Sequence, residues 1–279
     1  MLQVVTDSSC DLPEELVKQF NIRIVPLTIN IDDHAYLERV EITPEEFYDK
    51  MAHSCKLPKT SQPPPVAFAQ AFRELSHLGQ VICLTISSKL SGTYQSACLG
   101  RELSGVDVTV FDTLAGSLGH GLQVLKACKL AKAGCIASEV LSELDRYRKE
   151  MKIFILLNTL ENIVKGGRLS KFQGNLAKIL NIKLLLHNVD GEVVLLEKVR
   201  GKKRFMDRVF QSIQEFCPDM TGREVGITHF RNPDDAELIR QGLNEKCRPQ
   251  GYLINKMGPT MATYAGEGGI IVSLLINNG

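Results

Sequence analysis

Residues 81–96, VICLTISSKLSGTYQS, combine a predicted strand, a turn and the start of a predicted helix. The apolar, β-branched run over residues 81–86 is typical of a buried strand. Small hydroxyl residues follow, and the helix is expected to begin near Ser91 and Gly92. The first N–H groups of a helix have no intrahelical partner and carry partial positive charge, so such a turn can hold an anion.

The residues of this turn limit the class of ligand that it is predicted to bind. Residues 87–92 contain neither the Gly-x-x-x-x-Gly-Lys of a P-loop nor the spaced glycines of a dinucleotide-binding fold. The expected guest is therefore a carboxylate or a single phosphate. The alternative is that these hydroxyls cap the helix and bind nothing, and from this stretch alone the two interpretations have equal weight.

Composition excludes several classes of protein. The chain has 279 residues, of which 44% are hydrophobic, and its 33 Lys and Arg nearly balance its 32 Asp and Glu. This balance argues against nucleic acid as a partner and allows at most transient membrane contact. The N-terminal residues look like a first strand rather than a signal peptide, so we expect a cytoplasmic protein.

No cofactor or metal is expected. The eight cysteines form no Cys-x-x-Cys pair, and the six histidines are scattered. Free cysteines in apolar segments behave as small hydrophobic residues, and a disulfide framework is not expected in a cytosolic chain of this size.

Alternating strand and helix patterns run through both halves of the chain and predict an α/β fold with two α/β domains. The pattern restarts near residue 150, which divides the chain into residues 1–150 and 151–279. Asp190-Gly191 between two apolar runs predicts a hairpin. A capping box with proline at its second position predicts a helix that begins after Thr43.

Other polar loops follow predicted strands or helices. Residues 6–13 form a turn with a helix cap expected at Ser9 or Asp11. Residues 59–65, KTSQPPP, are expected to form a rigid, extended loop. A glycine-dense loop is expected over residues 258–269, where backbone can approach a ligand closely. Asp7 and Ser8 lie where open α/β sheets place ligands, although turn and capping roles explain them at least as well.

Ser117 lies in Ala115-x-Ser117-x-Gly119, a near miss to the nucleophile elbow of α/β-hydrolases. The elbow requires glycine at the first position and a tight turn directly after a strand, and here residues 112–114 intervene. We therefore interpret the small residues as a means of close helix packing.

Taken together, the loops at residues 6–13, 59–63, 87–94 and 165–168, with the terminal glycine loop, closely resemble the DegV family. The resemblance covers essentially the whole chain. It implies a two-domain α/β fold shared with the substrate-binding subunit of dihydroxyacetone kinase. It also implies a non-catalytic subunit that binds one long-chain fatty acid, with the tail in a buried apolar tunnel, and presents the acid to a separate ATP-binding kinase subunit. The acyl phosphate formed there feeds phospholipid synthesis.

The resemblance also implies which residues contact the ligand. The family's carboxylate contacts fall on Thr60, Ser61, Ser91, Gly92 and Thr93. Held by hydroxyl donors without a basic clamp, the carboxylate would keep one oxygen free to attack ATP.

Two arginines complete the implied contacts. Arg168 matches a family arginine after two glycines, where it could face the ligand or a partner. Arg200, in the basic cluster at residues 198–204, matches one implicated in engaging the kinase subunit.

The glycine loop departs from the family pattern. Many members carry histidine where this chain has Tyr264, and proline where it has Glu267. Tyr264 can still donate a hydrogen bond to a carboxylate, so it is included among the expected contacts. Glu267 is expected to add negative charge near the guest.

Two other classes of function remain open. One is a regulatory module that binds a lipid or small acid, is uncoupled from a kinase, and docks a partner at residues 200–208. The other is a serine hydrolase with Ser117 or Ser91 as its nucleophile.

Overall fold

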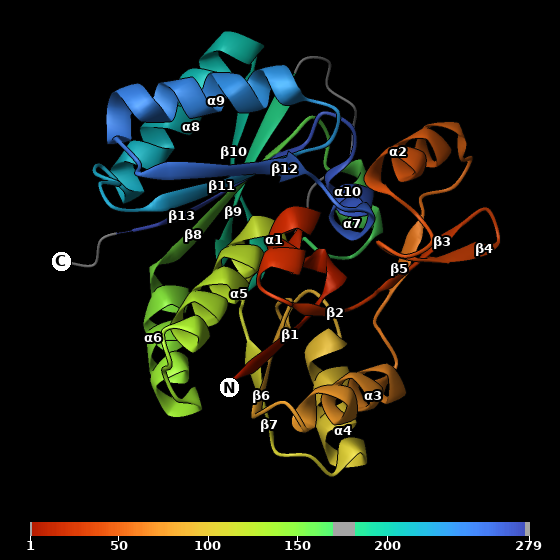
Figure 1. Cartoon of the computed structure of the whole chain (residues 1–279). Coiled ribbons are helices and arrows are strands. Elements are labelled where there is room, and N and C mark those ends of the chain that lie inside the picture. The colour runs from red at the N-terminus through yellow and green to blue at the C-terminus, as the bar shows by residue number, and fades with distance from the viewer. Residues whose placement is uncertain (1, 170–181, 277–279) are drawn as a thin grey trace.

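The computed structural model describes residues 2–169 and 182–276, and Figure 1 shows their arrangement. The first sheet has four parallel strands in the order β2, β1, β6, β7. Its strands are β1 (Gln3–Asp7), β2 (Arg23–Val25), β6 (Val81–Thr85) and β7 (Val108–Asp112). The helices α3 (Pro65–Ser76) and α4 (Thr93–Ser104) bury their apolar residues against one face of this sheet.

A small antiparallel sheet projects from the first half of the chain, at the right of Figure 1. It consists of β4 (His34–Leu37), β3 (Thr28–Ile31) and β5 (Lys59–Ser61), in that order. The predicted capping box is confirmed: the Thr43 side chain and the Glu46 side chain cap α2 (Pro44–His53) reciprocally. Residues 59–61 were expected in a loop but pair with β3 instead, because the prolines begin only at Pro63 and leave these backbone groups available.

The third sheet is mixed and has six strands in the order β10, β9, β8, β13, β11, β12. The strands are β8 (Met151–Leu157), β9 (Ile182–Val189), β10 (Glu192–Arg200), β11 (Glu224–His229), β12 (Gly251–Lys256) and β13 (Ile270–Leu275). The helices α8 (Lys202–Phe216) and α9 (Pro233–Cys247) lie along one face (Figure 1). The Asp190-Gly191 hairpin between β9 and β10 is confirmed, and both turn residues have positive φ.

The helix α5 (Ser117–Lys132) lies between the first and third sheets and is buried on almost every side of its first three turns. Two glycines of α5 permit this close approach of its neighbours. A Cβ on Gly119 would lie 2.5 Å from Ile153, and one on Gly121 would lie 2.4 Å from the carbonyl oxygen of Cys10. Close helix packing, rather than a nucleophile elbow, is thus the role of these small residues. Because α5 contacts both sheets, the division of the chain at residue 150 stays a prediction.

Four further helices lie within the part of the chain that the structure describes. They are α1 (Glu14–Gln19), α6 (Ala137–Glu150), α7 (Glu161–Lys165) and α10 (Pro259–Ala265). The last corrects the prediction that residues 258–269 form a loop, since Pro259 occupies a first-turn position where its missing N–H costs nothing. The helices within residues 2–169 and 182–276 include none that is long and apolar enough to cross a bilayer.

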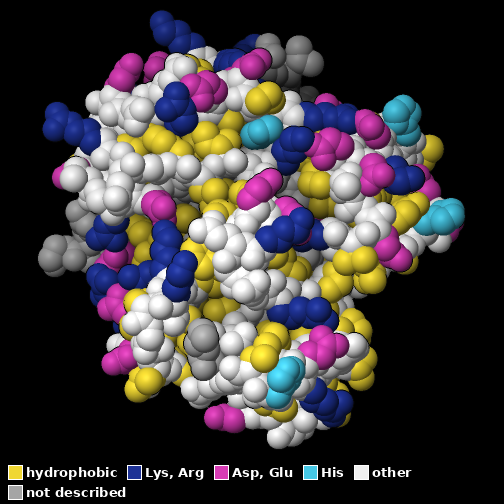
Figure 2. All heavy atoms as spheres, in the orientation of Figure 1, with side chains coloured by type: hydrophobic (Ala, Val, Ile, Leu, Met, Phe, Trp, Pro, Cys, Tyr) yellow, Lys and Arg dark blue, Asp and Glu magenta, His cyan; other side chains and the backbone are white. Residues whose placement is uncertain are grey.

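The visible surface mixes both signs of charge. Figure 2 shows both Lys and Arg side chains and Asp and Glu side chains over this face, with several Lys and Arg side chains close together at the left of the view. This distribution agrees with the near-zero net charge of the sequence.

Candidate functional site

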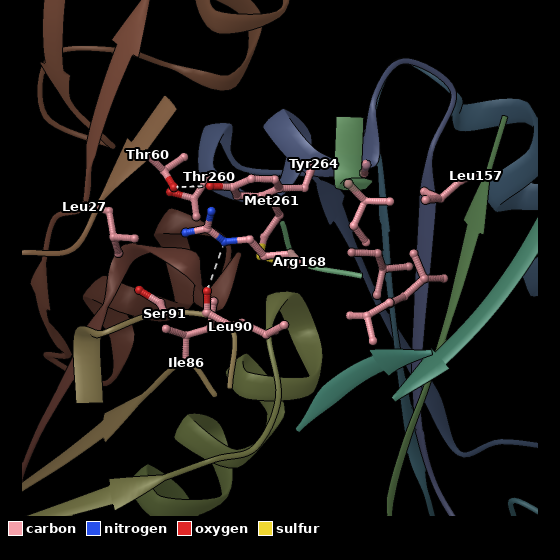
Figure 3. A pocket seen from close by; sticks show the side chains of 15 residues that line it. Leu27, Thr60, Ile86, Leu90, Ser91, Leu157, Arg168, Thr260, Met261 and Tyr264 are labelled. Atoms are coloured by element: carbon pink, nitrogen blue, oxygen red, sulfur yellow. Dashed lines mark hydrogen bonds between the residues drawn. The ribbon is translucent and has the colours of Figure 1, made fainter. Parts of the chain in front are cut away.

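A pocket lies where the strand–turn–helix stretch of the first sheet meets the third sheet and α10 (Figure 3). Its empty space, counted out to its mouth and with the open solvent there included, is about 560 Å³. Most of its lining is apolar. The apolar lining residues are Leu27, Ile86, Leu90, Ile155, Leu157, Ile163, Val193, Met261, Ala265 and Ile271.

Polar side chains gather at one end of this pocket. The hydroxyls of Thr60 and Tyr264 lie 2.6 Å apart and share a hydrogen bond. In Figure 3 the guanidinium of Arg168 lies between this pair and Ser91. Thr260 also lines the pocket. Hydroxyl and guanidinium donors around one end of an apolar cavity can hold a carboxylate there.

Arg168 is held in place by three separate parts of the chain. Its Nε donates to the Leu90 carbonyl at 3.2 Å, its Nη1 donates to the Gly166 carbonyl, and its guanidinium stacks over the Tyr264 ring at 4.8 Å. Gly167 ends the helix with φ of 72°, and a Cβ on Gly166 would lie 2.4 Å from the Tyr264 ring. The two glycines therefore let the chain turn and let Tyr264 pack closely. The pocket lining thus includes an arginine beside the hydroxyls that were expected to hold the carboxylate.

The start of α4, where an anion was expected to bind, is only partly in the pocket. Ser91 lines it, but Gly92 and Thr93 do not. The Ser91 hydroxyl accepts the Thr93 N–H at 3.3 Å and shares a hydrogen bond with the Thr93 hydroxyl at 2.9 Å. The side-chain amide of Gln62 lies against Gly92, since a Cβ there would be 2.2 Å from its oxygen. Ser91 therefore accepts the N–H of the first residue of α4 and also lines the pocket, and whether this turn binds an anion stays a prediction.

Two buried carboxyl groups hold the first turn of α10 from beneath. Glu38 is 0% exposed and accepts hydrogen bonds from the Ser8 hydroxyl and from both the N–H and hydroxyl of Thr260. Asp11 is 3% exposed and accepts from the Gly258 N–H at 3.0 Å and the Ser117 hydroxyl at 2.6 Å. These contacts fix the helix that carries Thr260, Met261 and Tyr264 into the pocket.

Burial perturbs both carboxyl groups. Loss of hydration raises the pKa of Asp11 to about 8, with the nearby Glu38 carboxyl adding to the rise and the Ser117 hydrogen bond opposing it. Burial likewise raises the pKa of Glu38, against the lowering effect of its hydrogen bonds. Neither residue was predicted from the sequence as a support of the site.

Several predicted residues lie away from the pocket. The helix cap expected at Ser9 or Asp11 is wrong, because α1 begins after Pro13 without a side-chain cap. Asp7 instead caps the 3-10 turn at Ser8–Cys10 by accepting the Ser9 N–H. Ser117 is 0% exposed and hydrogen-bonded to Asp11 and Thr228. A nucleophile at Ser117 therefore has no access to the pocket.

Three exposed residues also fall outside the lining of the pocket. They are Ser61 on β5, Arg200 at the end of β10, and Glu267 after α10. The negative charge expected from Glu267 near the guest is therefore not in the pocket.

Thr260 and Met261 are pocket residues that the sequence argument did not select. The sequence contains a signal for this helix. Pro259 suits the first turn of a helix, and the six residues after it contain no glycine before Gly266.

Among the described residues, no three His, Cys, Asp or Glu side chains gather as a possible metal site.

The chain matches a known family over nearly its full length. The model described as "Uncharacterised protein, DegV family" matches residues 1–276. The chain belongs to the DegV family. A DegV domain-containing protein of Caldanaerobacter subterraneus is 35% identical over 267 residues, which is 95% of each chain.

Solved DegV structures share the fold. A fatty-acid-binding DegV family protein from Thermus thermophilus has a TM-score of 0.90 and 33% identity over 99% of each chain. A DegV lipid-binding protein of Thermotoga maritima has a TM-score of 0.90 and 29% identity, over 99% of this chain and 98% of its own. The predicted α/β fold of the DegV family is confirmed.

Proposed function

We propose that this DegV protein binds one long-chain fatty acid, with the carboxylate at the polar end of the pocket and the tail along its apolar walls. The observation that supports this most directly is the gathering of Thr60, Ser91, Arg168 and Tyr264 at one end of an otherwise apolar cavity. The related DegV structures, a lipid-binding protein of Thermotoga maritima and a fatty-acid-binding protein of Thermus thermophilus, support the same ligand class.

In this proposal the hydroxyls orient the carboxylate and Arg168 balances its charge. Ser61, Gly92 and Thr93 stay in the proposal as neighbours that shape the same loops, since Thr93 holds the Ser91 hydroxyl and Ser61 adjoins Thr60. The apolar walls supply affinity, because each buried methylene contributes about 0.8 kcal/mol before ordering costs.

The ligand itself can be identified directly. Protein purified from a bacterial host without added ligand should yield a stoichiometric long-chain acid on denaturing mass spectrometry and lipid extraction. Protein that is empty, and that takes up no long-chain acid on titration, would contradict the proposal.

Replacement of both Thr60 and Ser91 by alanine should weaken fatty-acid affinity by at least about tenfold, because each hydroxyl hydrogen bond to a charged group contributes roughly 1.5–3 kcal/mol. Displacement of a fluorescent fatty acid measures this. Ser88→Ala is the matched control, since Ser88 is an exposed serine of the same turn. A folded double variant with wild-type affinity would remove these residues from the site.

We further propose that the bound acid is presented to an ATP-binding kinase subunit, which forms the acyl phosphate. Arg200 is exposed at the end of β10, outside the pocket, and is the proposed contact with that subunit. With such a subunit and ATP, hydroxylamine should trap an acyl hydroxamate. Arg200→Ala should lower its yield about tenfold or more while fatty-acid affinity is unchanged. Failure of the wild-type protein to support hydroxamate formation with any cognate subunit would favour a regulatory binding module.

A further inference from the structure

A second cavity adjoins the pocket on the same side of the third sheet. Its empty space is about 320 Å³, and it shares five lining residues with the first cavity. The shared residues are Leu90, Ile155, Val193, Met261 and Ile271. Ile155 and Ile271 are paired on the adjacent strands β8 and β13, and Val193 lies on β10 of the same sheet, beyond β9. All three belong to one hydrophobic cluster, so the two cavities share an apolar wall.

The Met261 side chain contacts the backbone of Gly116 where the two cavities meet. A Cβ on Gly116 would lie 3.0 Å from the Cε and 3.4 Å from the Sδ of Met261, so the end of the Met261 side chain rests on the Gly116 backbone. Gly116 lines the second cavity only, whereas Met261 lines both. The Met261–Gly116 contact is therefore a partition between the cavities.

This partition is built from a movable side chain. Methionine is unbranched and adapts its shape at low cost, and Met261 is only partly buried. Gly116 has extended backbone with φ of −140°, so a larger residue is allowed there by the backbone. Met261 also lies one turn before Tyr264 on α10, which places the partition and the proposed carboxylate contact on one face of the same helix.

We propose that Met261, closing against Gly116, determines the acyl chain length that this protein accepts. The proposal rests on the proposed fatty-acid binding. A chain short enough to end in the first cavity leaves the partition closed. A longer chain must displace the Met261 side chain and continue into the second cavity, between β8, β10 and residues 114–116.

The affinities of saturated acids from lauric to arachidic acid test this role of Met261. Within the first cavity each added methylene should raise affinity by about fourfold, which corresponds to ~0.8 kcal/mol. At the partition the gain per methylene should fall. We call the chain length at which this gain falls the break. Met261→Ala opens the passage, so the break should disappear or move to chains longer by at least two carbons. Met261→Ile, with a stiff β-branched side chain, should strengthen the break and weaken the longest acids by about tenfold or more.

Two further variants separate this effect from a general loss of packing. Gly116→Ala narrows the passage from the opposite side and should move the break in the same direction as Met261→Ile. Ile163→Val, at a position that lines only the first cavity, should change the affinity of all acids by a common factor. Thermal melts confirm that each variant is folded.

The outcomes distinguish the two proposals. Wild-type protein that binds none of the acids would overturn the proposed function itself. Binding with an identical length profile in wild type, Met261→Ala and Met261→Ile would leave fatty-acid binding intact and overturn the role of Met261.

Discussion

Arg168→Met is expected to weaken fatty-acid affinity by roughly 10- to 100-fold while affinity for the long-chain alcohol of the same length changes little. Among the described residues that line the pocket, Arg168 carries the one charged side chain. A carboxylate that leaves water for an apolar pocket requires a compensating charge or strong donors. Hydrogen bonds to charged groups contribute about 1.5–3 kcal/mol. An alcohol carries no charge and gains little from the guanidinium, so the ratio of acid to alcohol affinity isolates the role of Arg168.

The controls address its structural contacts. Arg168 also donates to the Leu90 and Gly166 carbonyls and stacks on Tyr264, so its removal can loosen the pocket wall for both ligands. Lys165→Met is the matched control, because Lys165 lies on the same turn but is exposed and paired with Glu161. Arg168→Met with an unchanged ratio of affinities would show that hydroxyls alone hold the carboxylate.

The free energy of unfolding is expected to contain a contribution from Asp11 that falls as pH rises from about 4 to about 8. The folded-state pKa of Asp11 is raised to about 8, chiefly by burial, whereas an unfolded Asp titrates near 4. The native state therefore binds more protons than the unfolded state in this interval, and stability decreases as pH increases. The expected loss is on the order of a few kcal/mol.

Asp11→Asn tests this, because it removes the titration and keeps an amide oxygen that can accept from the Gly258 N–H in place of Oδ1, while the amide NH2 can donate to the Ser117 hydroxyl in place of Oδ2. Its backbone suits the change, since Asp11 has φ of 52° and asparagine tolerates the left-handed region. Urea unfolding of both proteins between pH 4 and 8 gives the difference in stability at each pH. The buried histidines titrate in both proteins and cancel in this difference. We expect the variant to gain stability relative to wild type as pH rises, and a constant difference would refute the assignment.

Several local features could be read from the sequence because they depend on neighbouring residues alone. The capping box at Thr43, the Asp190-Gly191 hairpin and the strand at residues 81–85 are each specified within a few positions. The α10 helix was missed because glycines flank it on both sides, and Glu38 and Asp11 support its first turn from distant parts of the chain.

The sequence by itself determined the alternation of strands and helices, the family, and which loops carry hydroxyl and basic side chains. Only the tertiary structure decided which of them meet. Thr60 and Tyr264 are 204 positions apart and share a hydrogen bond, and Arg168 rather than Gly92 or Thr93 joins them at the pocket. Local propensities act over a few residues, whereas such contacts arise from the packing of whole sheets and helices. A cavity is left where side chains fail to fill space, so its lining residues look like core residues in the sequence, as Met261 and Ile155 do.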